Sequence, residues 1–386
     1  MKRYSLYNVG ISLALLFLVS SCQAQKQVIT PANKNATPET RLLLQNLKIL
    51  AKKGVMFGHQ DALAYGVTWR YEEGRSDIKD VVGDYPAVYG WDLGGMEHNE
   101  VNDIDGVPFA KTKKWISEIY DRGGISTFSW HMDNPLTAGD SWDVKPNSLS
   151  SILPGGNKHE LYKKWLDNAA NFLADLKGSD GKMVPILYRP FHELTGTWFW
   201  WCQNVASPAD FKAIWKFTFD YLVKEKKLNH LLFVYNTADF QSIEAFEEYY
   251  PGDNYVDLVS YDKYANQGGK TIPEWVNDCR KQLEIMTQFA DKHNKVIAIA
   301  EIGYEQIPEP TFWTQSLQKI TDGFPVSFVL VWRNHGWQEH EKKMHYYAPY
   351  AGHPSNPDFQ KYYDQTNTFF QKDLSKLKIY SELLKQ

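Results

Sequence analysis

A short segment of the chain combines an arginine, a histidine and a carboxylate at the end of an apolar run. The run covers residues 183–187, the motif RPFHE follows at residues 189–193, and the aromatic cluster WFWW occupies residues 198–201. Aromatic side chains pack against apolar surfaces while polar groups around them supply hydrogen bonds, a combination that suits the C–H faces and hydroxyls of a sugar. These residue types therefore indicate a site that holds a sugar and protonates its leaving oxygen.

A second carboxylate, Glu301, ends another apolar run at residues 296–300. Glycoside hydrolysis uses one carboxyl group as the acid and a second on the other side of the sugar, about 5–5.5 Å away in retaining enzymes. Glu193 follows Arg189 and His192 and precedes Trp198, an apolar neighbour that favours a protonated acid. Glu301 is expected to be the ionised nucleophile, with a hydrogen bond from Tyr261. The alternative is a Glu–Arg pair that only braces the fold.

Eight apolar segments are predicted to form the strands that carry these groups, and helical periodicity fills most of the gaps between them. The strands are expected at residues 54–60, 86–94, 124–133, 183–193, 230–236, 256–262, 295–303 and 326–334, and the helices at 37–53, 110–122, 159–176, 206–227, 272–293, 310–322 and 357–374. Apolar strands that alternate with helices indicate a parallel sheet buried on both faces. Eight units predict a single (β/α)8 TIM barrel with long βα loops around an open cleft. A doubly wound open sheet is the alternative.

Most of the predicted strands end in polar or aromatic residues. These are His59, Gln60, Trp91, Asp92, Trp130, His131, His192, Glu193, Asn236, Tyr261, Glu301, Trp332 and Arg333. The strand ends of a barrel meet at one mouth, where active sites lie. We therefore expect these side chains to line one cleft, although Asp92 can equally bind substrate or brace a neighbouring strand.

The composition is compatible with sugar binding. The chain has 386 residues, a net charge of −4 and 15% aromatic residues, including 14 Trp and 23 Tyr. This charge gives no basic footprint for nucleic acid. The many aromatic residues are typical of carbohydrate-binding surfaces, and also of large α/β cores.

The amino terminus has the pattern of a bacterial lipoprotein signal. Lys2 and Arg3 precede an apolar run at residues 9–19, and the motif VSSC ends at Cys22. This run is short for a membrane-spanning helix and predicts a signal peptide over 1–22 with Cys22 lipidated, a tether over 23–37 and the barrel over 38–386. An ordinary signal cleaved near Ala24 is the alternative. No acidic residue directly follows Cys22, which favours an anchor facing the periplasm over surface display, with the lipid as the one membrane contact.

Three motifs together resemble those of glycoside hydrolase family 26. They are RPFHE at 189–193 with Trp198 beyond it, AEIG at 300–303, and VWR at 331–333. The similarity extends over about residues 40–385. The resemblance implies a (β/α)8 β-mannanase that cleaves β-1,4-mannosidic bonds in mannan, glucomannan or galactomannan with retention, without metal or organic cofactor.

The resemblance also implies a role for individual residues. Glu193 matches the acid/base and Glu301 the nucleophile. The substrate-binding positions are His131, His192, Trp198, Tyr261, Trp332 and Arg333. Among them, His192 positions the acid or contacts the sugar, Tyr261 hydrogen-bonds Glu301, Trp332 lies under the sugar being cleaved, and Arg333 binds the next sugar.

Two other functions remain open from the sequence. A β-1,3-1,4-glucanase or β-1,3-xylanase of the same fold is one alternative. The motifs do not encode recognition of an axial 2-hydroxyl, so they do not distinguish these substrates from mannan. A glycan-binding lipoprotein without activity explains the anchor and the tryptophans, but gives no reason for two facing carboxylates. The segment DIDG at residues 103–106 is similar to a calcium loop but lacks the remaining ligands, so no metal is expected.

Overall fold

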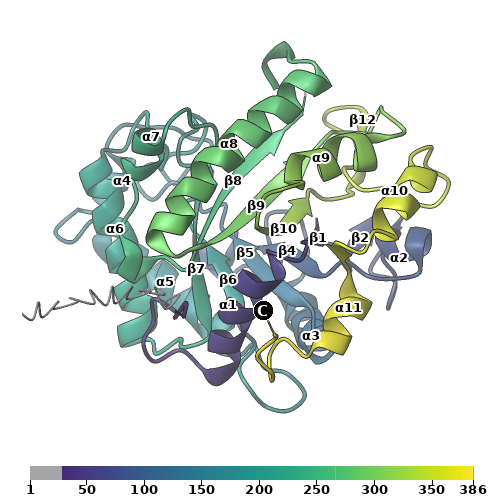
Figure 1. Cartoon of the computed structure of the whole chain (residues 1–386). Helices are drawn as coiled ribbons and strands as arrows, with labels where there is room; N and C mark the ends of the chain where they lie inside the picture. The colour runs from purple at the N-terminus through teal and green to yellow at the C-terminus, as the bar shows by residue number, and fades with distance from the viewer. Residues whose placement is uncertain (1–27, 266, 386) are drawn as a thin grey trace, which may run out of the picture.

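The computed structural model describes residues 28–265 and 267–385 (Figure 1). The predicted signal peptide and its lipidated Cys22 lie outside the described residues. Among the residues that are described, no helix is both long and apolar enough to cross a membrane. The longest, α8 (Ile272–His293), buries one face, which includes Trp275, Cys279 and Leu283.

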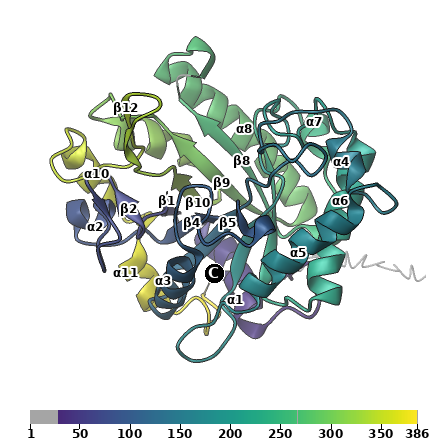
Figure 2. The same ribbon diagram turned by 180° about the vertical axis from the view of Figure 1, so that it is seen from behind.

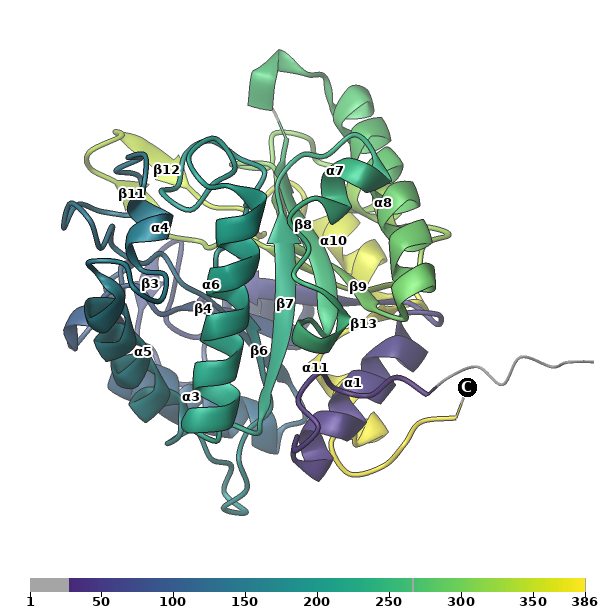
Figure 3. The same ribbon diagram turned by 90° about the vertical axis from the view of Figure 1, so that its left-hand side faces the viewer.

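The core of the molecule is a closed barrel of eight parallel strands (Figures 1 and 3). They are β1 (Val55–Gln60), β4 (Val88–Asp92), β5 (Ile125–Ser129), β6 (Ile186–Arg189), β7 (Leu231–Thr237), β8 (Leu258–Tyr264), β9 (Val296–Gly303) and β10 (Val326–Val331). Each pairs with the next in this order, and β10 pairs back to β1 with Gly58 opposite Leu330. The closing pair excludes an open sheet and confirms the predicted TIM barrel.

Helices surround the barrel, as the front and back views show (Figures 1 and 2). They are α1 (Pro38–Leu50), α2 (Asp77–Val82), α3 (Phe109–Asp121), α4 (Ser148–Ser151), α5 (His159–Leu173), α6 (Pro208–Asp220), α7 (Ile243–Glu247), α8, α9 (Gln318–Thr321), α10 (Asn356–Tyr363) and α11 (Gln371–Leu377). Two begin at a capping side chain: the hydroxyl of Thr37 accepts from the Thr40 amide, and that of Ser207 from the Asp210 amide. Such side-chain acceptors satisfy amide groups that the first turn leaves free.

The single helix predicted over residues 357–374 is instead broken in two. Between α10 and α11, Thr368–Phe369 form β13, which lies beside β1 with Thr368 opposite Val55. The Val55 amide donates to the Asn367 carbonyl at 2.9 Å. The amino end of β1 needs this backbone partner, and extended chain supplies it where helix cannot.

The described part of the predicted tether packs against the barrel rather than running free. Ile29 and Ala32 are buried, and the Ala32 amide donates to the Asp257 carboxylate at 2.6 Å. The Thr37 amide donates to the Asn229 carbonyl at 2.8 Å. Residues 28–37 are therefore part of the folded domain.

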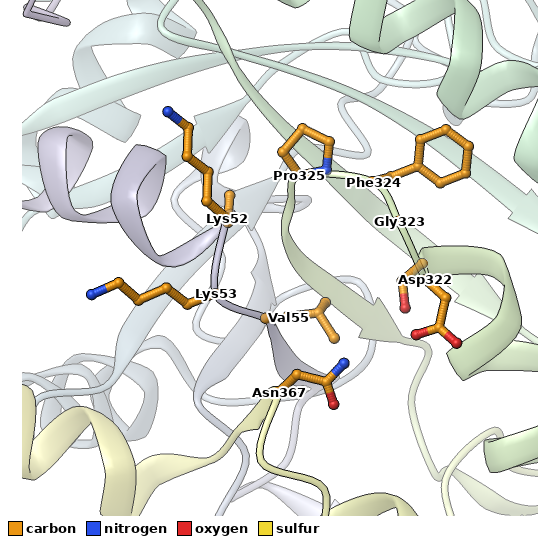
Figure 4. Close-up of a pocket in the computed structure, with 11 residues that line it drawn as sticks. Lys52, Lys53, Val55, Asp322, Gly323, Phe324, Pro325 and Asn367 are labelled. Atoms are coloured by element: carbon orange, nitrogen blue, oxygen red, sulfur yellow. The ribbon is translucent and has the colours of Figure 1, made fainter. Parts of the chain in front are cut away.

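A hollow lies at the amino-terminal ends of β1 and β10 (Figure 4). The connection from α1 to β1 and the loop before β10 line it, with Lys52, Lys53, Asp322, Phe324 and Asn367 among its residues. Active sites of TIM barrels lie at the opposite, carboxyl-terminal face. The predicted strand-end residues belong to that opposite face.

Candidate active site

The two carboxylates predicted from the sequence lie together at the mouth of the barrel. Glu193 follows β6, the fourth barrel strand, and Glu301 lies in β9, the seventh. One carboxylate oxygen from each of Glu193, Asp262 and Glu301 lies within 4.8 Å of the other two, and all three residues are buried. Retaining glycosidases place their carboxyl groups about 5–5.5 Å apart and inverting ones about 6.5–9.5 Å apart. Oxygens this close are nearer the retaining than the inverting arrangement.

Two donors fix the orientation of the Glu301 carboxylate. The Arg189 guanidinium forms an ion pair with one of its oxygens, and the Tyr264 hydroxyl donates to the other at 2.6 Å. Arg189 also forms an ion pair with Asp262 at 2.5 Å. Charge-assisted hydrogen bonds of this kind stabilise a negative charge and set its direction. Glu301 is therefore held as a buried, oriented carboxylate that faces Glu193.

The tyrosine that contacts Glu301 is Tyr264, and the prediction of Tyr261 is wrong. Tyr261 is fully buried, and its hydroxyl donates to the Cys279 carbonyl of α8 at 3.1 Å. Successive side chains of a strand point to opposite faces, so Tyr261 faces the helices while Asp262 and Tyr264 face the barrel mouth. A register shift between β8 and β9 also occurs between Tyr261 and Asp262.

Glu193 has the surroundings expected of an acid. Its backbone is in the left-handed region, with φ of 54°, and its amide donates to the Asn236 side chain at 2.7 Å. The Trp198 indole donates to its carboxylate at 2.5 Å. Burial, followed by the charges of Asp262 and Glu301, raises the pKa of Glu193 well above its usual range. Unfavourable backbone conformations persist where the surrounding structure enforces them, often at functional sites.

A polar network joins the two glutamates through Asn236, which was among the strand ends expected in the cleft, and Asp262, which was not predicted there. Asn236, at the end of β7, accepts from the Glu193 amide and donates to Asp262 at 2.8 Å. Asp262 in turn pairs with Arg189, which holds Glu301. Each of these residues is polar and lies at or near the end of a barrel strand. That position is the signal in the sequence that points to them.

His131 and His192 also lie in the cleft, in contact with each other. Their Nε2 atoms are 3.1 Å apart, and Nδ1 of His131 bonds the Asp92 carboxylate at 2.8 Å. Burial, then the charges of His131 and Arg189, lowers the pKa of His192 well below its usual range. Trp142 stacks on the His131 ring with centroids 5.5 Å apart. The structure thus brings the two predicted histidines into contact, and His192 directly precedes Glu193 in the chain.

Trp332 and Arg333 follow β10 and are partly buried. The Trp332 ring lies 6.3 Å from that of His131, and Arg333 forms an ion pair with Asp105 at 2.8 Å. Asp105 belongs to the calcium-like segment at 103–106. In that segment the Asp103 carboxylate accepts the amides of Asp105 and Val107, each at 2.9 Å. The segment is a hydrogen-bonded turn that presents Asp105 to Arg333.

Exposed tryptophans from three different loops surround these residues. Trp142 follows β5, Trp198 follows β6, and Trp337 lies in β11 (Gly336–Gln338), which follows β10. Their side chains are 49%, 39% and 53% exposed, respectively. β11 pairs with β12 (Lys343–His345) in a hairpin. Trp142 stacks on His131 and Trp198 donates to Glu193, so two of these exposed rings adjoin the predicted site residues. Their position agrees with a cleft that is lined for sugars.

Among the described residues, two clusters of acidic or histidine side chains have ligand atoms close enough to bind one metal ion. In the first, Glu193, Asp262 and Glu301, the Arg189 guanidinium already supplies the positive charge. In the second, Glu97 accepts from the Trp130 indole at 2.9 Å and from the Asp133 amide at 2.8 Å, and His98 bonds Asp133. Protein donors thus engage both clusters, and a reaction without metal or cofactor stays a prediction. Within residues 28–265 and 267–385, the cysteines Cys202 and Cys279 are buried and form no disulfide.

A (β/α)8 barrel with two close carboxylates at the ends of its fourth and seventh strands defines a class of protein, the glycoside hydrolases that work with a carboxylate pair. Residues 32–348 match the sequence profile of glycosyl hydrolase family 26. The chain belongs to this family.

Relatives of known name or structure agree with this membership. A GH26 beta-mannanase from Bacteroides ovatus is 40% identical, with a TM-score of 0.82 over 86% of this chain and 95% of that one. The catalytic domain of a Bacillus sp. JAMB-750 GH26 endo-beta-1,4-mannanase gives 27% identity and a TM-score of 0.83 over 92% and 97%. A mannan endo-1,4-beta-mannosidase of Bifidobacterium adolescentis is 29% identical over 88% of this chain, which spans only 35% of that protein's length.

Proposed function

We propose that the protein is a retaining endo-β-1,4-mannanase. The observation that carries this proposal is the pair of buried carboxylates, Glu193 and Glu301, with oxygens within 4.8 Å of each other. In the first step Glu301 attacks the anomeric carbon while Glu193 protonates the leaving oxygen, which gives a covalent glycosyl-enzyme and a shortened chain. In the second step Glu193 takes a proton from water, which displaces Glu301 and releases the sugar.

The substrate in this proposal is mannan, glucomannan or galactomannan. The names of relatives in the same family support it, because the Bacteroides ovatus and Bifidobacterium adolescentis proteins are both described as mannanases. In the cleft, Trp332 would lie under the sugar being cleaved and Arg333 would bind the next sugar. Trp198 would flank the leaving group while it orients Glu193.

The test is a product analysis with mannan, lichenan and β-1,3-xylan as separate substrates. We expect manno-oligosaccharides from mannan, with the first product in the β configuration by NMR. Release from lichenan or β-1,3-xylan alone would replace mannanase with one of the two related glycanases, and an inverted first product would exclude double displacement.

A matched pair of variants tests the nucleophile. Glu301→Ala removes the attacking carboxylate, and we expect the rate on mannan to fall by about 10⁴-fold or more, as for other catalytic nucleophiles. Oligosaccharide binding, measured by calorimetry, should persist. The control is Glu248→Ala, which removes an exposed carboxylate at the end of α7. Equal rates in the two variants would mean that Glu301 is not the nucleophile.

We further propose that Cys22 is lipidated and anchors the barrel to the membrane on its periplasmic side. The basic residues Lys2 and Arg3, the short apolar run and the motif ending in Cys22 support this proposal. Expression of Cys22→Ala in a Gram-negative host should release the enzyme from the membrane fraction. Retention of that variant in the membrane would contradict lipidation at Cys22.

A further inference from the structure

Asp92, the last residue of β4, uses all of its hydrogen-bonding capacity inside the protein. It is 1% exposed. One carboxylate oxygen accepts the amides of Gly94 at 2.6 Å and His131 at 3.1 Å. The other accepts the Ser129 hydroxyl at 2.6 Å and His131 Nδ1 at 2.8 Å. A carboxylate has about four acceptor positions. Asp92 therefore has none left for a sugar hydroxyl and acts through another residue.

The residue through which Asp92 acts is His131. Because an ionised carboxylate only accepts hydrogen bonds, Nδ1 of His131 carries a proton and donates it to Asp92. Burial opposes ionisation of Asp92, but the charge of His131 and these hydrogen bonds hold the pKa of Asp92 below its usual range. Burial also opposes ionisation of His131, but the charge of Asp92 raises the pKa of that ring. Nδ1 of His131 carries a proton in the charged ring and in the neutral ring that donates to Asp92. The remaining nitrogen of His131, Nε2, faces Nε2 of His192 at 3.1 Å. Both nitrogens of His131 are thus engaged by protein.

His192 connects this pair to the acid. It directly precedes Glu193 in the chain, is 1% exposed, and makes its ring hydrogen bond to His131. The aromatic contacts of His131, with Trp142 and Trp332, do not distinguish a ring turned by 180° from the observed one. The hydrogen bonds to Asp92 and to His192 do so, because the turned ring would place a carbon against each of these partners.

We propose that Asp92 is a positioning residue of this active site: it holds His131 in one tautomer and one ring orientation, and through His131 it fixes His192 beside Glu193. The chain Asp92–His131–His192 then supports the side of the cleft that receives the sugar being cleaved. The catalytic consequence rests on the proposed mannanase function, whereas the tautomer of His131 does not depend on it.

The first measurement is the tautomer of His131 in the unmodified protein. Long-range ¹H–¹⁵N NMR of histidine-labelled protein distinguishes protonated from bare ring nitrogens, and the signals of His131 are those lost in His131→Gln. We expect a protonated Nδ1. A bare Nδ1 would overturn the proposal without any need for an Asp92 variant to fold.

The second measurement uses Asp92→Asn, which keeps the size of the side chain but has one accepting oxygen and one donating amino group. With its oxygen on the two backbone amides, its amino group faces His131, so Nδ1 must lose its proton. We expect the ¹⁵N signals of His131 to change accordingly. We also expect kcat on mannan to fall about 10- to 100-fold, the usual cost of removing the partner that orients a functional histidine, with a smaller change in KM.

The matched control is Ser129→Ala, which removes another hydrogen bond to the same oxygen of Asp92 but leaves the proton on His131 Nδ1. The ¹⁵N signals of His131 in this variant should match those in the unmodified protein, and kcat of the variant should stay within about twofold. If Asp92→Asn and Ser129→Ala lower kcat equally, Asp92 is only a structural brace and the proposal fails. If the unmodified protein shows a protonated Nδ1 but cleaves no mannan, the proposed function fails while the positioning of His131 stands.

Discussion

At the scale of single residues, the site is a balance of charges around Glu193. Asp262 and Glu301 raise the pKa of Glu193, the effect of burial being larger still, whereas the Trp198 hydrogen bond and the charge of Arg189 lower it. Three carboxyl groups share one guanidinium, so protonation of one carboxyl relieves the excess negative charge. Burial also raises the pKa of Asp262, to about 8, although the charge of Arg189 opposes this rise. Because Arg189 forms its ion pairs with Asp262 and Glu301, we expect Glu193 to hold the proton.

This balance predicts the pH dependence of the reaction. The acid must be protonated in the free enzyme, so kcat/KM on mannan should fall as the pH rises through the raised pKa of Glu193. Asp262→Asn removes a negative charge and should move this fall to lower pH. Trp198→Phe removes a donor that stabilises the ionised form and should move it to higher pH. The pH profiles of kcat/KM for the three proteins provide the measurement. Shifts of the same sign in both variants would rule out Glu193 as the titrating acid.

The sequence predicted the reacting pair but not the groups that hold it. Glu193 and Glu301 are recognisable because each ends an apolar run, a local property. The choice between Tyr261 and Tyr264 depends on which face of β8 points into the barrel. The end of β8 carries a charged residue on each face, Asp262 and Lys263, so alternation does not reveal which face points inward. The pairing of Arg333 with Asp105 joins residues more than two hundred positions apart and is equally invisible in local pattern.

At the scale of elements, all eight predicted strands are confirmed, because buried parallel strands form unbroken apolar runs. The short helices α2 and α7 were not predicted, because six and five residues give too few turns for a clear periodicity. The break between α10 and α11 has a different origin. Residues 364–369 leave helical structure to pair with β1, and tertiary pairing of this kind overrides local preference.

At the scale of the whole molecule, the site exists because the sheet closes between β1 and β10. Side chains of the seam are tightly packed: a Cβ added at Gly58 would lie 3.1 Å from the Val88 side chain and 3.2 Å from that of Leu330. Leu330 is 1% exposed. Protein interiors at this density do not relax fully when a side chain is shortened.

Two leucine variants test whether the packed seam between β1 and β10 stabilises the barrel. Leu330→Ala should lower the free energy of unfolding by about 2–5 kcal/mol, through lost burial and the cavity left behind. Leu383→Ala makes the same change at a residue that is 58% exposed and should cost less than about 0.5 kcal/mol. Thermal unfolding midpoints measure both. Because Glu193 and Glu301 lie on other strands, kcat of Leu330→Ala well below its midpoint should stay near that of the unmodified protein. Equal midpoints for the two variants would mean that the packed seam does not stabilise the barrel, and a large loss of kcat would mean that the seam sets the carboxylate geometry directly.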